Sequence, residues 1–327
     1  MWRTICRVAM LAGGICAGIP ALCQAQSPPY PTRLITLVVP FVPGGATDLI
    51  ARIVAQHLGK ELGQSVIVEN RPGASGIVGT GAVAKSPPDG YTLVLGSADT
   101  IVINPHLHKE LPFDSLTDLA PIALLADAPE FIVASASLPA SNLREFIELA
   151  RAKPGGFNYG SPGVGTVPHL AGARFARMIG TEMVHVPFSG SAAAMTEVGS
   201  GSVQMTISTK ASADSFVQTG RVKFLAIASP RRLDSLPDIP TTAEAGLPGY
   251  EIANWWGIFA PQGTRPDIIA LLNSSLRMTF DDPENAALLT RLGIVPVKST
   301  VQEFAERIRL DDQRWKEIVA ESGVHLD

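Results

Sequence analysis

The sequence predicts an α/β fold that is built in two domains, and three observations support this prediction. Segments rich in branched apolar residues alternate with segments of helical periodicity along most of the chain, which is typical of α/β architecture. The length of 327 residues is more than one compact core usually holds. Two strand-like stretches, at residues 121–135 and 250–261, lie where the chain would leave the first domain and return to it. Two crossings predict a cleft between the domains, where ligands commonly bind.

Residues 1–25 have the pattern of a secretory signal peptide. Arg3 and Arg7 precede an apolar stretch. Ala25 follows this stretch as the last residue before a plausible cleavage point, and Cys23 occupies the −3 position, where a small residue is preferred. A membrane anchor fits less well, because the apolar run is short and Pro20 follows it. A lipid on Cys23 is also disfavoured, because the residues before it fit a lipoprotein cleavage site poorly. We therefore expect an exported protein that is cleaved near Ala25.

Cysteine and charge content narrow the function further. All three cysteines, Cys6, Cys16 and Cys23, lie inside the expected leader, which excludes disulfides, thiolate catalysis and cysteine-ligated zinc in the mature chain. An exported chain without cysteine fits a bacterial periplasm. Removing the two leader arginines changes the formal charge from −4 to −6 and leaves no basic run, so we do not expect nucleic acid as a partner. No other segment reaches membrane-spanning length without a polar interruption, which predicts a soluble mature protein.

The segment before residue 100 predicts three strands and two helices. Residues 33–41 form a near-continuous apolar run, typical of a strand that is buried on both faces. Apolar residues from Leu49 to Leu62 then recur at helical spacing, and Gly63 ends that helix. The following elements are a strand at 65–70, a helix at 76–86, a turn at 87–90 and a strand at 91–97.

The alternation continues as far as the C-terminal helices. A helix at 141–155 is expected to begin at Ser141 or Asn142. Thr300 and Glu303 form a T-x-x-E capping box for a long amphipathic helix. The remaining strands are expected at 121–127, 130–135, 157–161, 183–188, 202–209 and 222–229. Helices are expected from about 166 to 179 and from about 191, and a short helix is expected after 209.

Three loops each join the end of a strand to the start of a helix. The first loop, residues 40–48, has the sequence PFVPGGATD. Gly44 and Gly45 allow positive φ angles and leave no side chain to block a ligand. Free N–H groups and the helix dipole at such a junction favour an anion. Taken alone, the loop is equally compatible with a tight turn in which Thr47 or Asp48 only caps the helix.

The other two loops repeat this design and favour the binding interpretation. The second loop, YGSPGVGTVPH at residues 159–169, combines glycines that expose the backbone with the hydroxyl donors Ser161 and Thr166. The third loop, PFSGSAAA at residues 187–194, again places small residues between a strand and a helix. Three such loops in two domains would line one cleft from both sides.

Charged and aromatic side chains near the loops give weaker signals. None of the three loops contains Lys or Arg, but backbone amides and hydroxyls can bind carboxylates without them. Lys210 is the nearest candidate cation, although a solvated surface position is expected for it. His169 is as compatible with packing or capping as with ligand contact. Of Trp255 and Trp256 on the returning strand, we expect one in the core and the other at the cleft.

Enzyme and metal motifs are poorly matched. Gly79, Gly81 and Ala84 fit G-x-G-x-x-A, but a loop rather than a strand precedes them, which disfavours a dinucleotide site. The sequence contains no G-x-S-x-G elbow, no P-loop and no H-E-x-x-H. Its histidines show no metal-ligand spacing. We therefore expect neither catalysis nor a cofactor nor a metal ion.

A succession of segments points to a known family. In chain order these are YPTRLITLVVPFVPGGATD, VIVENRPGASG, PPDGYTL, NPHLHKELPFD, NYGSPGVGTVPHLAG, HVPFSG, LPDIPTTAEAGLPGYE and APQGT. The succession resembles the Bug-type periplasmic substrate-binding proteins, which serve tripartite tricarboxylate transporters. It covers nearly all of the mature chain and is specific to the family, though not to a ligand.

The resemblance implies a two-lobed class II periplasmic-binding-protein fold with a ligand cleft between the lobes. The first lobe would comprise residues 26–127, the second lobe 128–250, and residues 251–327 would return to the first lobe and form the C-terminal helices. The expected ligand is a small organic acid, and the expected partners are the membrane subunits of such a transporter. There are two alternatives. One is an exported α/β hydrolase-like enzyme, and the other is a binding protein that serves a sensor kinase rather than uptake.

The resemblance also implies a set of ligand-binding residues, which act through main-chain amides and bridging waters. They are Pro43, Gly44, Gly45, Ala46, Thr47 and Asp48 from the first loop, Ser161, Gly163, Gly165, Thr166 and His169 from the second loop, and Phe188, Ser189 and Gly190 from the third loop. A carboxylate repels a carboxylate ligand, so Asp48 should meet a donor on the ligand or a bridging water and act as the selector.

Three departures from the family pattern bear on the ligand. The family often has Tyr-Lys-Gly where this chain has Phe-Ser-Gly at residues 188–190, and it often has Tyr at the position of His108. The segment at residues 205–215 is also atypical. A monocarboxylate, an aromatic acid or an amide-bearing ligand is therefore compatible with the sequence, alongside the usual dicarboxylates and tricarboxylates.

Overall fold

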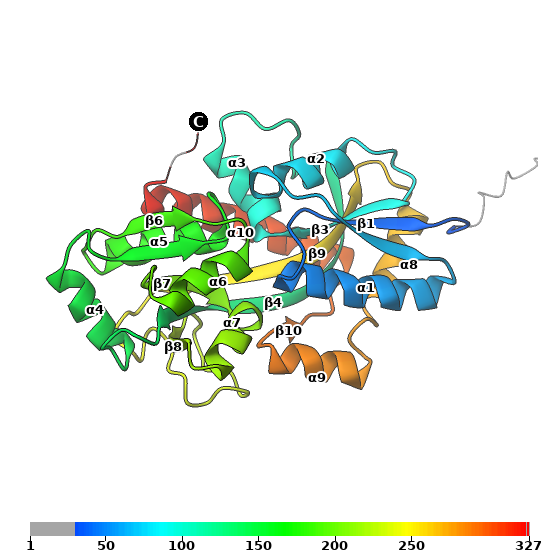
Figure 1. The fold of residues 1–327 in the computed structure, drawn as a ribbon. Coiled ribbons are helices and arrows are strands. Elements are labelled where there is room, and N and C mark those ends of the chain that lie inside the picture. Colours follow the sequence, from blue (N-terminus) through cyan, green and yellow to red (C-terminus); the bar gives the residue numbers. More distant parts are fainter. Residues whose placement is uncertain (1–29, 325, 327) are drawn as a thin grey trace, which may run out of the picture. The chain divides into compact units, whose positions relative to one another are not determined.

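One long strand, β4 (Leu119–Ser135), belongs to two sheets and connects them (Figure 1). Its first part pairs antiparallel with β9 (Ala253–Pro261), and its last part pairs antiparallel with β7 (Met205–Thr209) and β8 (Val222–Ile227). The two strands expected at 121–127 and 130–135 are thus a single strand. The computed structural model describes residues 30–324 and 326, so the expected leader lies outside the described residues.

The first sheet has the strand order β2-β1-β3-β9-β4, with the short β10 also on β4. Strands β1, β2 and β3 are parallel, whereas β9 runs antiparallel to β3. Helix α1 packs on β1 and β2, α2 on β3, and α8 on β4 and α1. The bounds are β1 (Ile35–Val39), β2 (Val66–Asn70), β3 (Thr92–Ser97), β10 (Val295–Pro296), α1 (Ala46–Leu62), α2 (Ile77–Ala84) and α8 (Pro266–Leu276).

The second sheet continues from β4 through β7 and β5 to β6, and β8 also pairs with β4. Helices α5 and α6 pack on β5 and β7, and α7 packs on β7 and β8. The bounds are β5 (Asn158–Ser161), β6 (Val184–Pro187), α4 (Leu143–Ala152), α5 (Val167–Met178), α6 (Ser191–Ser200) and α7 (Lys210–Gln218). These elements agree with the strands and helices expected from the alternating pattern.

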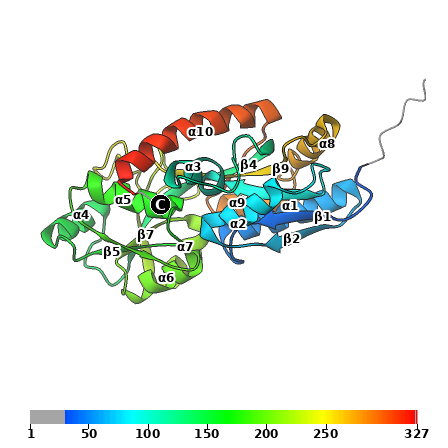
Figure 2. The same ribbon diagram turned by 90° about the horizontal axis from the view of Figure 1, so that it is seen from above.

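The C-terminal helix α10 (Val301–Ser322) links the two halves, because it packs against β4, α5 and the π-helical turn η2 (Asp99–Ile103) (Figure 2). It begins with the expected capping box, in which the Thr300 and Glu303 side chains each accept a backbone N–H of the other residue. The remaining elements are the 3₁₀ turn η1 (Ala74–Gly76), α3 (Asn104–Leu107) and α9 (Pro283–Arg291). Among the described residues, no helix is long and apolar enough to span a bilayer.

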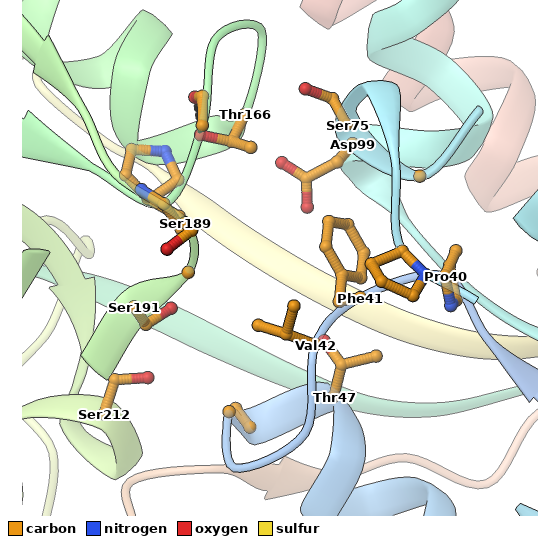
Figure 3. Close-up of a pocket in the computed structure, with 18 of the residues that line it drawn as sticks. Pro40, Phe41, Val42, Thr47, Ser75, Asp99, Thr166, Ser189, Ser191 and Ser212 are labelled. Atoms are coloured by element: carbon orange, nitrogen blue, oxygen red, sulfur yellow. Dashed lines mark hydrogen bonds between the residues drawn. The ribbon is translucent and has the colours of Figure 1, made fainter. Parts of the chain in front are cut away.

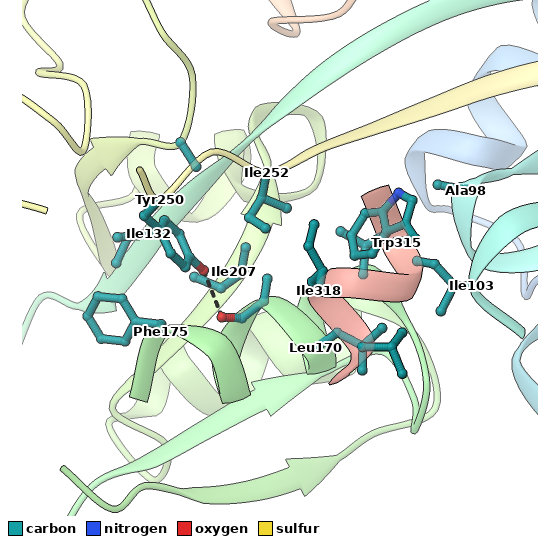
Figure 4. Close-up of a cluster of buried hydrophobic side chains, with 14 of the residues drawn as sticks. Ala98, Ile103, Ile132, Leu170, Phe175, Ile207, Tyr250, Ile252, Trp315 and Ile318 are labelled. Carbon is teal, nitrogen blue, oxygen red and sulfur yellow. Dashed lines mark hydrogen bonds between the residues drawn. The ribbon is translucent and has the colours of Figure 1, made fainter. Parts of the chain in front are cut away.

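A hydrophobic core extends across both sheets (Figure 4). Trp315 and Ile318 of α10 pack into the same cluster as Leu170 and Phe175 of α5. The buried Tyr250 donates its hydroxyl to the Ala171 carbonyl oxygen at 2.8 Å, which satisfies its polar atom inside the core. Residues of α5, β4 and α10 share this cluster, so their packing holds α5 and β4 against α10.

Candidate ligand-binding site

A cavity of about 690 Å³ lies where the loops of the two sheets meet. Four helices, α1, α5, α6 and α7, begin at its wall, and each is the next element along the chain after a strand. The lining residues are 40–47, 72–76, 99, 130, 162–164, 166, 168, 189–193, 208, 209, 212, 254 and 256. All three loops identified in the sequence therefore contribute to one cavity, as the cleft hypothesis requires.

The N-cap residues of α1, α5, α6 and α7 give these helices no side-chain cap, and Figure 3 shows side chains that line the cavity around them. At α5, the first N–H, that of Val167, is bonded to the Asp99 carboxylate at 2.5 Å and the next residue, Pro168, has no N–H, so α5 offers fewer free donors than α1, α6 and α7. Helices α4, α9 and α10, which begin elsewhere, are capped by Asn142, Asp282 and Thr300, whereas α8 begins elsewhere without a side-chain cap. The first N–H groups of an uncapped helix are free to bind a ligand, and the helix dipole makes that end electropositive. The cavity therefore offers several backbone donors to an anion without any cationic side chain.

Asp48 braces the first loop from inside and does not line the cavity. It accepts hydrogen bonds from the Gly44 N–H at 3.2 Å and from the Asn70 amide at 3.0 Å. It also accepts hydrogen bonds from Nε and Nη2 of Arg52 at 3.0 and 3.1 Å. Burial raises the pKa of Asp48, but the hydrogen bonds from Arg52, Asn70 and Gly44 outweigh it, so the pKa lies below its usual value. This geometry gives Asp48 the role of holding the loop in shape.

The two glycines of the first loop differ in conformation. Gly44 has a φ of +92°, as expected for a glycine turn, whereas Gly45 has an ordinary φ of −91°. Only Gly44 therefore uses the positive φ that the two glycines allow. Beside them, the Trp256 indole N–H donates to the Thr47 hydroxyl at 2.9 Å, and both residues line the cavity. Trp255 is fully buried against Phe304, so the two tryptophans divide between core and cavity as expected.

The second loop contributes part of its predicted set. Gly163 and Thr166 line the cavity, whereas Ser161, Gly165 and His169 lie behind it. The Ser161 hydroxyl donates to the Gly163 carbonyl oxygen at 2.9 Å, and the Gly165 N–H donates to His169 Nδ1 at 3.0 Å. The three residues behind the wall thus fix the backbone that faces the cavity.

The third loop presents Ser189 and Gly190 to the cavity. Phe188 does not line it and packs against Gly160 in the adjacent strand, where an added Cβ would come within 3.2 Å of the ring. A Cβ on Gly190 would come within 2.7 Å of Val42 from the first loop. The first and third loops therefore approach each other closely at this point, and a larger residue at Gly190 would disturb that contact.

Several lining residues were not identified from the sequence, and two of them are acidic. Asp99 and Glu130 line the cavity together with Asn254, although they lie on three segments that are far apart along the chain. None of the described lining residues is Lys, Arg or His. Lys210 is buried rather than solvated, because its ammonium group donates to Asp214 at 2.6 Å and to the Arg291 carbonyl oxygen at 2.5 Å. The expectation of a surface lysine was wrong.

Two stacked histidines support the second loop from behind. The rings of His169 and His185 have centroids 3.7 Å apart. Burial lowers the pKa of His169 to about 4, and burial together with the neighbouring His169 lowers the pKa of His185 to about 3. Both rings are therefore neutral near pH 7 and resist protonation in the folded state.

This pair predicts an acid-sensitive contribution to stability. The unfolded chain binds protons at His169 below about pH 6.5, whereas the folded chain does so only below about pH 4, so stability falls as the pH drops through that window. In chemical denaturation, the parent should be more stable than His169→Asn at pH 7, and the gap should narrow by about 2 kcal/mol at pH 5, at about 1.4 kcal/mol per pKa unit. A gap that stays constant with pH would contradict this prediction. Titrating groups that do not interact with His169 cancel in the comparison, whereas His185, whose pKa His169 lowers, does not.

Among the described residues, no cluster of His, Cys, Asp or Glu is arranged to hold a metal ion. The site is thus built from backbone donors, hydroxyl groups, an amide and two buried carboxyl groups.

Comparisons with known proteins agree with this architecture. Protein BugT of Bordetella pertussis is 34% identical over 311 residues, which cover 95% of each chain. The structure of Rhodopseudomonas palustris Rpa4515 with adipate is 33% identical, covers 91% of this chain and 99% of that chain, and superposes with a TM-score of 0.88. MatC of the same organism with bound malate is 32% identical, covers 89% and 100%, and has a TM-score of 0.84.

These likenesses confirm the predicted two-lobed periplasmic-binding-protein fold. The family model for the tripartite tricarboxylate transporter family receptor matches residues 50–324. On this evidence, the chain belongs to the family of tripartite tricarboxylate transporter receptors, to which the sequence segments pointed.

Proposed function

We propose that this receptor captures a small carboxylate in the cavity and holds it on the uncapped N-termini of α1, α6 and α7. The observation that carries the proposal is the convergence of these three N-termini, none of which has a side-chain cap, on one cavity. Relatives whose structures hold adipate and malate support a carboxylate as the ligand class. Charge-assisted hydrogen bonds from backbone N–H groups to a carboxylate are about twice as strong as neutral ones.

The proposal extends to where the protein works and what it serves. The leader expected over residues 1–25 would direct export and be cleaved near Ala25, and the mature receptor would deliver its ligand to the membrane subunits of a tripartite tricarboxylate transporter. The lobes would comprise residues 26–127 with 251–327, and residues 128–250. Because loops from both sheets line the cavity, a bound ligand bridges them and favours a closed arrangement.

We also infer that the site binds its ligand without turnover. Ser161 Oγ lies 2.7 Å from His185 Nε2, which resembles a nucleophile and its general base. The lowered pKa of His185, near 3, makes the ring a poor base at neutral pH, and no carboxylate is bonded to it among the described contacts. Ser161 is fully buried and does not line the cavity, so a substrate would not reach its hydroxyl group.

A thermal-shift screen of organic acids against neutral analogues of the same shape tests the ligand class. A ligand that binds the folded state alone stabilises it by about 2.7 kcal/mol at one hundred times its Kd. We expect at least one small carboxylate to raise the Tm by several degrees while its methyl ester does not. An ester that stabilises as much as its acid, or a complete lack of response to carboxylates, would contradict the proposal.

A further inference from the structure

A buried carboxyl group without a partner lies at the wall of the cavity. Glu130 is 1% exposed, lines the cavity, and its Oε2 has no hydrogen-bond partner in the described part of the chain. Its backbone is fixed on both sides, because its N–H donates to the Ile252 carbonyl oxygen at 3.0 Å and its own carbonyl accepts the Ala228 N–H at 2.8 Å. The strand thus holds this side chain at the point where β4 passes from β9 to β7.

The neighbouring carboxyl group, Asp99, is by contrast well supplied with donors. It accepts the Val167 N–H at 2.5 Å, the Ser97 hydroxyl at 3.0 Å and the Asn254 amide at 3.1 Å. Burial raises the pKa of Asp99 above its usual value, although these hydrogen bonds oppose that effect. Burial and the negative charge of Asp99 raise the pKa of Glu130 to about 8. Of the pair, Asp99 has the donors that favour an ionised carboxylate, whereas Glu130, with no donor at Oε2, favours the protonated form at neutral pH.

In the part of the chain that the structure describes, no hydrogen-bond partner reaches Glu130 Oε2. The titratable groups near Glu130 are Asp99 of η2, Tyr250 just before β9, and Lys210. Lys210 is near because it directly follows Thr209 of β7, which is paired with Glu130. The Tyr250 hydroxyl is bonded to the Ala171 carbonyl oxygen, and the Lys210 ammonium is bonded to Asp214. An unpaired buried carboxyl group destabilises a folded protein, so its position at a cavity wall points to a partner on the ligand.

We propose that the ligand is a carboxylate that also carries an N–H donor group, an ammonium or a carboxamide, and that Glu130 accepts this donor at the acidic end of the cavity beside Asp99. The inference rests on the proposed function, which places the ligand carboxylate on the helix N-termini. A second ligand carboxylate at the acidic end would meet the Asp99 charge and no cation, and would be repelled. An ammonium group would instead pair with Glu130 after that residue releases its proton.

Calorimetric titration of length-matched acids tests the inference on the parent protein. The diacids are succinate, glutarate and adipate, and each is compared with its half-amide and with the ω-amino acid of the same carbon number. At pH 7 we expect an N–H-bearing member to bind at least tenfold more tightly than its diacid, and the half-amide and amino-acid arms identify which donor is preferred. For an ammonium ligand, titrations in buffers of different ionisation enthalpy should also show proton release.

The variant Glu130→Gln keeps the size of the side chain and removes its ability to ionise. We expect the preference for an ammonium-bearing ligand to fall at least tenfold and proton release to disappear, because a neutral amide cannot form an ion pair with the ammonium group. The Tm without ligand should stay close to that of the parent, because one neutral buried polar group replaces another. Asp127→Asn is the matched control. Asp127 is a half-buried carboxyl group on the same strand whose pKa is also raised by burial, but it is bonded to Arg307 and lies outside the cavity lining. It should leave the ligand preference unchanged.

The outcomes separate this inference from the proposed function. Tighter binding of the diacids, or of any carboxylate that lacks an N–H donor, would overturn the inference and leave carboxylate capture standing. An unchanged preference for an ammonium-bearing ligand in Glu130→Gln would also overturn it. Binding of no carboxylate of any kind would overturn both. The titrations of the parent decide the question even if the variant fails to fold.

Discussion

Replacing Gly45 with valine is expected to weaken carboxylate binding by two or more orders of magnitude while changing the Tm of the unliganded protein very little. Gly45 has an ordinary φ of −91°, and a Cβ built on it meets no atom within 4 Å, so the folded chain accepts a side chain there. The open space is the cavity itself, which Gly45 lines at the start of α1. A valine would displace the ligand carboxylate from the backbone N–H groups. Losing two charge-assisted hydrogen bonds at about 1.5–3 kcal/mol each lowers affinity more than a hundredfold.

The measurement is calorimetric titration of a screened ligand beside thermal melts without ligand. Gly45→Ala should give an intermediate loss of affinity. Gly59→Ala serves as a control in the same helix, because its nearest neighbour, the Gln64 carbonyl oxygen, lies at an ordinary 3.5 Å and the residue is outside the cavity lining. Gly165 is a poorer position for this test. A side chain there would be strained by the φ of +81°, and its Cβ would lie only 3.0 Å from Leu107 Cδ1. Parent-like binding by Gly45→Val would show that the site lies elsewhere.

The second large effect is expected at Asp48, and it should appear in stability as well as in binding. Asp48→Ala removes the acceptor of the Gly44 N–H, the Asn70 amide and the Arg52 guanidinium. Hydrogen bonds to charged groups contribute about 1.5–3 kcal/mol each, and Arg52 is largely exposed, so we expect a total loss of roughly 2–4 kcal/mol. Affinity should fall too, because the loop that carries the backbone donors is no longer held in shape.

The pH dependence of this loss has a defined sign. The folded-state pKa of Asp48 is depressed, so its stabilisation is present above the unfolded value of about 3.8 and is lost as the pH falls through the folded value. Urea denaturation should therefore show a full difference between parent and Asp48→Ala at pH 7 that shrinks below about pH 4. Asp48→Asn keeps one acceptor oxygen and should lose less. A variant as stable as the parent at pH 7 would show that Asp48 does not brace the loop.

These two residues also show where the sequence pattern was sufficient and where it was not. The strand-glycine-helix spacing places Gly45 at a helix N-terminus, because that is a local property of consecutive residues. The φ angles of the two glycines are set by how the whole loop packs, and only Gly44 takes the positive value that glycine allows. Asp48 was expected to face the ligand, yet its side chain turns inward to Asn70, which lies on a neighbouring strand 22 positions further along the chain.

By itself, the sequence determined the α/β alternation, a helix cap at Ser141 or Asn142, the cap at Thr300, the three loops and the family. Each of these depends on residues that are close along the chain, where periodicity, capping and turn chemistry act. The tertiary structure alone decided which side chains meet at the cavity. Asp99 follows β3, Glu130 lies within β4 and Asn254 lies within β9, and antiparallel pairing of β9 with both other strands brings them together. No local signal marks such residues, because their environment arises only when segments more than a hundred residues apart pack side by side.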